Sequence, residues 1–232
     1  SSTATGSAEP YVSGVCGTHE CDHGTHVAGI VAGTHTGFSG VAPHADLIAV
    51  QVFSSFINPT YCGSSAPCSL TYNTDQLRAL EHIYSIRSSY DLISINMSLG
   101  GGKYTAPCNS DSRAPIIGNL RTAGIATVIA TGNAYYVDGV GGPSCISDAV
   151  AVGATYNNNN NVAPFSNAAP DMVDVWAPGV SITSSVPTES YGGTAPTDTW
   201  NGTSMATPMV AGAFAALKEA YPFLNSDGIL SL

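Results

Sequence analysis

Short apolar runs that do not alternate with polar residues constrain the fold of this chain more than any other feature. A strand that is apolar on both faces must be covered on both faces, as strands of parallel sheets are. Between these runs lie stretches with the spacing of helices. Strand-like runs occupy 45–53, 91–99, 125–132 and 149–155, and helical stretches occupy 73–89, 114–124 and 203–222. The pattern predicts an α/β fold of three layers, a mostly parallel sheet flanked by helices.

Local signals mark the ends of several elements. Asn73 or Thr74 is expected to cap the helix that follows, since either side chain can bond the first free N–H groups. Gly124 is expected to close the helix before it. The run "NNNNN" at 157–161 predicts a turn, because Asn tolerates left-handed backbone angles.

The helix expected over 203–222 is small or apolar nearly all round, which allows close packing against neighbouring backbone. We place Pro208 in its first turn, where a residue without an N–H costs no intrahelical hydrogen bond. Ser204 lies at the helix start, where free N–H groups and the helix dipole stabilise a nearby negative charge. Taken alone, the position of Ser204 favours a simple helix cap over a catalytic role.

Two predicted strands end in glycine-rich polar turns, "NMSLGGG" at 96–102 and "ATGNA" at 130–134. Binding sites of parallel sheets form at the carboxyl ends of the strands. The sequence therefore predicts that a binding site lies at these two turns.

Charge and length exclude several classes of function. The 232 residues suit one domain over 1–232, and the net charge of −10 disfavours nucleic acid and anionic membrane surfaces as partners. No apolar run approaches the roughly 20 residues needed to span a bilayer. The chain opens on "SSTATGSAEP" without a methionine, so we expect a processed product or a fragment.

The six cysteines favour disulfides in an oxidising compartment, because the count is even and no CxxC pair is present. Free buried thiols remain the alternative, and sequence alone does not prove pairing. The pairs we expect are Cys16–Cys21, Cys62–Cys68 and Cys108–Cys145.

A serine nucleophile needs a base to take its proton and donors to hold an oxyanion. His23, Asn133 and Ser204 could supply these from three separate elements. The words "HGTHVAGI", "SLGG", "ATGN" and "GTSMATPMVAGA" follow one another in this order along the chain. Their identity and order resemble the subtilisin-like serine peptidases, the subtilase family, through essentially the whole chain.

The resemblance implies a role for each site residue. His23 is the general base, Ser204 the nucleophile, and the Asn133 amide forms the oxyanion hole with the Ser204 N–H. Ser98, Leu99 and Gly100 form an edge that pairs with extended substrate, and Gly101 and Gly132 help to wall the pocket for the residue before the cleaved bond. The implied function is that of a secreted, monomeric endopeptidase acting on extended polypeptides.

The implied triad lacks its aspartate. The family's catalytic Asp precedes its His by about thirty residues, which places it upstream of Ser1. Asp22 adjoins His23 in sequence but does not match that position. We expect a subtilase domain shortened at both ends, with weak or no hydrolysis by this chain alone, because loss of the Asp costs about 10⁴ in kcat. The alternative is a non-catalytic, subtilase-like binding module.

A zinc site is the alternative to a catalytic role for His23. Zinc ligand types occur at Cys16, His19, Cys21, His23 and His26, but their spacing matches no zinc motif. We therefore expect no metal there, and expect His26 to be a buried, hydrogen-bonded histidine behind His23. No cofactor is identified, although the family resemblance leaves room for structural calcium.

Overall fold

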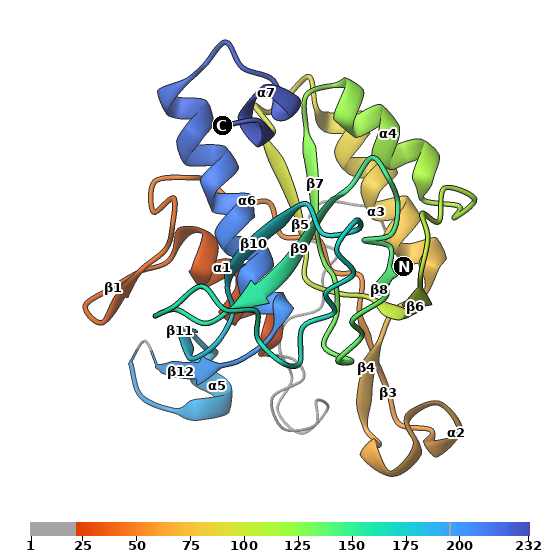
Figure 1. The fold of residues 1–232 in the computed structure, drawn as a ribbon. Helices are drawn as coiled ribbons and strands as arrows, with labels where there is room; N and C mark the ends of the chain where they lie inside the picture. Colours follow the sequence, from red (N-terminus) through yellow and green to blue (C-terminus); the bar gives the residue numbers. More distant parts are fainter. Residues whose placement is uncertain (1–21, 195) are drawn as a thin grey trace.

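The computed structural model describes residues 22–194 and 196–232, and its centre is a parallel four-stranded sheet (Figure 1). The strand order is β10-β9-β7-β5, and all three pairings are parallel. The strands are β5 (Ser94–Met97), β7 (Ala126–Ala130), β9 (Val150–Thr155) and β10 (Val175–Pro178). Every residue of β7 and β9 is buried, which accounts for their unbroken apolar sequences.

Helices cover both faces of this sheet. The long helix α6 (Thr203–Ala220) packs against all four strands, and α1 (His23–Ala32) packs on α6. On the other face α3 (Asn73–Ile86) packs against α4 (Ala114–Thr122), which contacts β7. The predicted three-layer α/β fold is confirmed.

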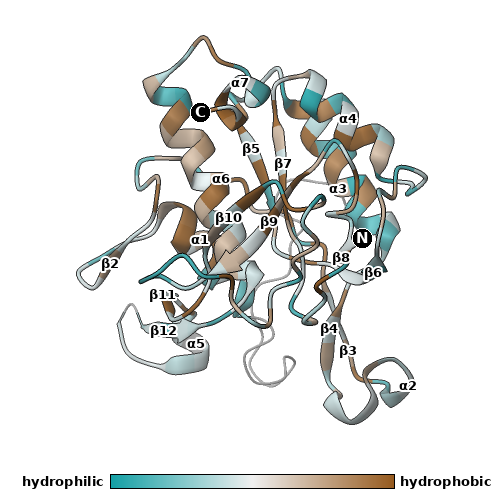
Figure 2. Ribbon diagram, in the orientation of Figure 1, coloured by the Kyte–Doolittle hydropathy of each residue, from teal (hydrophilic) through white to brown (hydrophobic). Residues whose placement is uncertain are grey.

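Neighbouring residues of β7 pack into two separate hydrophobic cores, one on each face of the sheet. Val128 is fully buried among residues of α6, including Ala206 and Phe214. Its neighbour Ile129 is fully buried with Ile117 of α4 on the opposite face. Figure 2 shows that β5 and β7, in the middle of the molecule, are largely apolar.

The remaining elements are short. Four two-stranded antiparallel sheets lie around the centre. They pair β1 (Thr34–His35) with β2 (Phe38–Ser39), β3 (Ser54–Phe56) with β4 (Cys68–Leu70), β6 (Gly101–Tyr104) with β8 (Val140–Gly142), and β11 (Ile182–Ser185) with β12 (Thr197–Trp200). Short helices are α2 (Pro59–Cys62), the 3-10 helix η1 (Gly63–Ser65), α5 (Thr188–Tyr191) and α7 (Ser226–Leu230), so α6 is followed by one more helical element.

The buried strand expected over 45–53 is wrong. The segment forms no strand, and its side chains are largely exposed, with Leu47 at 49% and Ile48 at 46%. The apolar pattern reports a tendency to be buried, but a strand also needs a neighbouring strand to bond. Among the described residues this segment has no paired strand, and β5 pairs only with β7.

The predicted element ends are correct to within a few residues. The predicted cap of α3 is wrong, because the helix begins at Asn73 and its N-cap is Tyr72, without a side-chain hydrogen bond. Gly124 has a φ of +83° just beyond α4, the conformation that made glycine a plausible stop. In the asparagine run, Asn160 adopts a φ of +57°, and the segment turns as expected.

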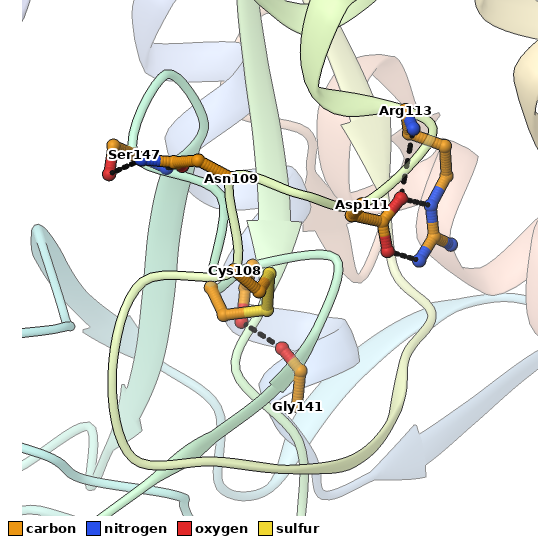
Figure 3. Close-up of a disulfide and its surroundings, with 8 residues drawn as sticks. Cys108, Asn109, Asp111, Arg113, Gly141 and Ser147 are labelled. Atoms are coloured by element: carbon orange, nitrogen blue, oxygen red, sulfur yellow. Dashed lines mark hydrogen bonds and ion pairs between the residues drawn. A yellow bond between two sulfur atoms is a disulfide. The ribbon is translucent and has the colours of Figure 1, made fainter.

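Two of the expected disulfides are present, Cys62–Cys68 at the end of the β3–β4 hairpin and Cys108–Cys145 beside β8. The third, Cys16–Cys21, lies outside the described residues. Figure 3 shows Cys108–Cys145 between two polar contacts. On one side Asn109 bonds Ser147 at 3.0 Å, and on the other Asp111 accepts two hydrogen bonds from the Arg113 guanidinium.

Arg113 connects the loop that contains Cys108 and Asp111 to helix α3. Its side chain is buried, its Nη1 donates to Gln76 Oε1 of α3 at 2.5 Å, and its Nη2 lies 2.6 Å from Asp111 Oδ2. Hydrogen bonds from the guanidinium lower the pKa of the Asp111 carboxyl. The disulfide loop, α3 and the start of α4 are therefore held as one unit.

We predict that the two disulfides differ in their contribution to stability. Cys108 and Cys145 lie 37 residues apart, and Cys62 and Cys68 lie 6 apart. Chain-entropy reasoning assigns about 4 kcal/mol to the long loop and about 2 kcal/mol to the short one. Denaturant unfolding of the Cys108→Ser/Cys145→Ser and Cys62→Ser/Cys68→Ser pairs measures both. An equal loss for the two pairs would contradict this account.

Candidate active site

One cleft of about 2210 Å³ is lined by every residue to which the sequence assigned catalysis or substrate binding. His23 is the first residue of α1, and Ser204 is the second residue of α6. Asn133 and Gly132 follow β7, and the turn from Ser98 to Gly101 follows β5. The cleft continues beyond them between β5 and the exposed 45–53 segment.

The topology explains why these residues meet. Strands β5 and β7 are parallel neighbours, with Met97 opposite Ile129, so both turns leave the same edge of the sheet. Helix α6 packs against both strands and directs its N-terminus to that edge. Three segments far apart in sequence thereby line one cleft.

The orientation of the Asn133 amide is set by Thr203. Asn133 Oδ1 accepts hydrogen bonds from Thr203 N and Thr203 Oγ1, both at 2.9 Å. A backbone N–H is only a donor, so the atom it meets is the amide oxygen. Nδ2 donates to no atom of the described residues, and Asn133 is exposed in the cleft. The Nδ2 donors are therefore available to a bound group.

Thr203 also holds the turn itself, because its Oγ1 accepts the Gly132 N–H at 3.2 Å. Sequence reasoning missed this residue. The signal was its position directly before Ser204 in "GTS", where a hydroxyl can reach across the helix start.

Pro208 lies in the second turn of α6, not in the first as expected. A residue without an N–H there leaves the carbonyl four residues earlier, that of Ser204, without its intrahelical donor. Ser98 Oγ donates to this carbonyl at 2.8 Å. The proline thus leaves the carbonyl of the predicted nucleophile without a helical donor, and the hydroxyl of Ser98, in the predicted substrate-binding turn, donates to it.

The turn predicted to bind substrate differs in detail from the expected edge. Residues 98–100 lie outside any strand, and β6 begins at Gly101 and pairs with β8 on one side. All four residues of β6 are exposed. A Cβ at Gly100 would lie 3.0 Å from the Gly142 carbonyl oxygen, so these two glycines approach one another closely. Gly142, in the cleft wall, was not assigned from sequence.

His23 is half-buried, and its pKa is lowered, first by burial and second by the neighbouring His26. Among residues 22–194 and 196–232, no carboxylate forms a hydrogen bond or ion pair with its ring. The Asp22 carboxylate accepts a hydrogen bond from Ser190 Oγ at 2.7 Å. The imidazole is accordingly favoured in its neutral form, the form that can accept a proton.

His26 is fully buried, as expected, and its Nε2 lies 3.2 Å from the Asp198 carbonyl oxygen. Its ring stacks on Trp200 with centroids 4.3 Å apart, and the same indole lies 6.5 Å from His23. Trp200 Nε1 donates to Asp198 Oδ2 at 2.7 Å. Trp200 lines the cleft and went unnoticed in the sequence, where nothing links residue 200 to the histidines.

No group of three or more His, Cys, Asp or Glu side chains within the described ranges is placed to hold a metal ion. Cys16, His19 and Cys21 lie outside those ranges. His35, His44 and His82 are half-buried or exposed and do not line the cleft.

We predict that Ser98→Ala destabilises the protein through the Ser204 carbonyl. An orphaned, partly buried acceptor costs about 1–3 kcal/mol. Thr122→Ala is the matched control, because the Thr122 hydroxyl bonds the Gly118 carbonyl inside an unbroken helix. Denaturant unfolding should show the larger loss for Ser98→Ala. In a Pro208→Ala background the loss should shrink, since position 208 then has an N–H, and an unchanged loss would refute the explanation.

We predict that the His23 imidazole titrates below its ordinary pKa of about 6.5. Because the folded pKa is lowered, the unfolded chain binds more protons in this window. Stability is therefore retained above about pH 6.5 and lost as the pH falls through the folded pKa. NMR titration measures the midpoint, and His23→Gln should reduce the loss of stability between neutral and mildly acidic pH. A midpoint above 6.5 would contradict this.

Comparison with known proteins finds relatives along nearly the whole chain. A profile of the subtilase family (Peptidase_S8) matches residues 17–230. Subtilisin E of Bacillus subtilis (strain 168) is 37% identical over 205 residues, covering 86% of this chain and 46% of its own. Subtilisin DY of Bacillus licheniformis is 35% identical over 212 residues, covering 89% and 67%.

Solved structures give the same result. Sphericase superposes with a TM-score of 0.71 at 29% identity, over 93% of this chain and 69% of its own. A cold-adapted subtilisin-like serine proteinase superposes with a TM-score of 0.70 at 27% identity, over 91% and 66%. The chain spans about half the length of several curated relatives that it matches. With a family profile over nearly its whole length, this chain belongs to the subtilase family.

Proposed function

We propose that the protein is a secreted serine endopeptidase that cleaves extended polypeptides through an acyl-enzyme. The observation that carries the proposal is the Asn133–Thr203 contact beside Ser204. It leaves an amide donor in the cleft at the N-terminus of α6, where a developing oxyanion is stabilised most. Family membership supports the same chemistry.

In the proposed reaction, Ser204 Oγ attacks the scissile carbonyl carbon while His23 takes the hydroxyl proton. The carbonyl π electrons move to oxygen, and the resulting oxyanion accepts hydrogen bonds from Asn133 Nδ2 and Ser204 N. Collapse breaks the C–N bond, and the amine leaves with the proton from His23. Water then attacks the acyl carbon while His23 takes a proton from it. Collapse breaks the bond to Ser204 Oγ, which regains a proton from His23, and the acid is released.

The exposed strand β6 and the turn before it are the proposed substrate edge. Their glycines leave backbone N–H and C=O groups accessible from Gly100 to Gly102, which suits pairing with an extended peptide. The Ser98–Ser204 bond would hold this edge in register with the nucleophile. Gly132 would line the adjoining pocket.

We propose that an aspartate upstream of Ser1 orients His23. The described residues supply no carboxylate bond to this ring, and family resemblance puts the residue earlier in the chain. The same observation favours the second candidate, a subtilase-like binding module without hydrolysis. Sequencing the upstream coding region separates them: an Asp followed by Thr or Ser and Gly supports the peptidase, and its absence supports the module.

No helix in the described ranges has both the length and the apolarity that a membrane crossing requires. Secretion is proposed from the disulfides, which persist in oxidising compartments.

We predict that a fluorophosphonate probe labels Ser204 in the full-length, folded protein. Ser204→Ala should abolish both labelling and peptide hydrolysis, whereas Ser231→Ala, at an exposed C-terminal position, should leave both unchanged. Asn133→Ala should lower kcat by about 10²–10³, the range known for loss of this donor in a subtilisin. A folded parent protein that is neither labelled nor hydrolytic would refute the peptidase assignment.

A further inference from the structure

Asn167 holds the turn that carries the oxyanion donor. It lies in the connection between β9 and β10, is 1% exposed, and belongs to none of the motifs quoted in the sequence analysis. We propose that Asn167 is a positioning residue for Asn133, acting on the reaction without touching substrate. The inference rests on the proposed function and deepens it.

The contacts of its side chain span the whole turn. Asn167 Nδ2 donates to the Thr131 carbonyl at 2.7 Å. Its Oδ1 accepts the N–H groups of Ala134 at 2.9 Å and Tyr136 at 3.2 Å. One buried amide therefore bonds the backbone both before and after Asn133.

The backbone of Asn167 adds two further contacts to the three made by its side chain. Its N–H donates to the Gly132 carbonyl at 2.9 Å, and its carbonyl accepts the Thr131 hydroxyl at 3.0 Å. Both peptide neighbours of Asn133 are thus bonded to the same residue. Asn133 itself contacts Thr203 through its side chain, so its backbone and its amide are fixed by different partners.

The turn needs this support because its backbone is unusual at two points. Gly132 has a φ of +102°, and a Cβ at that position would lie 2.6 Å from Asn167 Nδ2. Tyr135 adopts a left-handed φ of +60°, between the two amides that Asn167 Oδ1 accepts. Conformations of this kind persist only where surrounding bonds determine them.

Asparagine is the side chain whose chemistry fits. The site requires a donor toward one carbonyl and an acceptor toward two N–H groups from a short side chain. Aspartate has the same shape but places an oxygen against the Thr131 carbonyl, and alanine removes all three bonds. These two changes provide an isosteric and a deletion variant.

The test is a double-mutant cycle on peptide hydrolysis by the full-length protein. Asn167→Ala is expected to lower kcat by about 10–100-fold with KM changed less than about 3-fold, because small displacements of a catalytic group cost rate rather than binding. In an Asn133→Ala background it should lower kcat by less than about 3-fold, since it acts through the missing amide. Asn167→Asp should follow the same pattern and preserves the packing volume.

Ile117→Ala is the matched control, a fully buried truncation in α4 that is expected to lower the melting temperature and whose core cluster contains no residue of the turn over 131–136. It should leave kcat unchanged in both backgrounds. An equal loss of kcat from Asn167→Ala with and without Asn133 would show a merely structural role and overturn the inference, as would no loss at all. Failure of the proposed function would give a different result, a folded full-length protein in which the probe does not label Ser204. Failure of the Asn167 inference alone would give an active protein whose kcat does not depend on Asn167.

Discussion

The burial of β7 on both faces is the constraint on which the rest of the structure depends. Val128 and Ile129 point in opposite directions, and each is fully excluded from solvent. Each face requires its own helical layer, α6 on one side and α4 on the other. Because α6 is long and packs on every strand, its N-terminus meets the end of β7, and the nucleophile candidate reaches the Asn133 turn.

Elements with strong local patterns were predictable from sequence. The unbroken apolar runs became β7 and β9, and the helix spacing became α3, α4 and α6. The 45–53 segment failed because apolarity predicts burial, whereas a strand requires a neighbour whose position the pattern does not contain. Pro208 was misplaced by one turn although the helix start at residue 203 was predicted correctly, because residue 208 is the sixth residue of that helix and so belongs to its second turn.

The residues that orient the site were not predictable in the same way. Thr203 and Asn167 act on the Asn133 turn from 70 and 31 to 36 residues away in the sequence. Their side chains are ordinary polar groups, and only the fold shows that their donors and acceptors match this turn. Trp200 is a similar case, since its stacking on His26 joins β12 to α1. Sequence motifs identified the groups proposed to react, and the structure added the groups that hold them.

The glycines of the cleft wall have an evolutionary consequence. A Cβ at Gly100 would press on the Gly142 carbonyl oxygen, which is backbone, and a Cβ at Gly142 would press on the ring of Tyr104. A side chain at Gly100 therefore requires the backbone to move, and one at Gly142 requires the Tyr104 ring to move. Divergence in what the cleft accepts must then accumulate at its rim, at positions such as Tyr104, where side chains project from a backbone that descendants inherit unchanged.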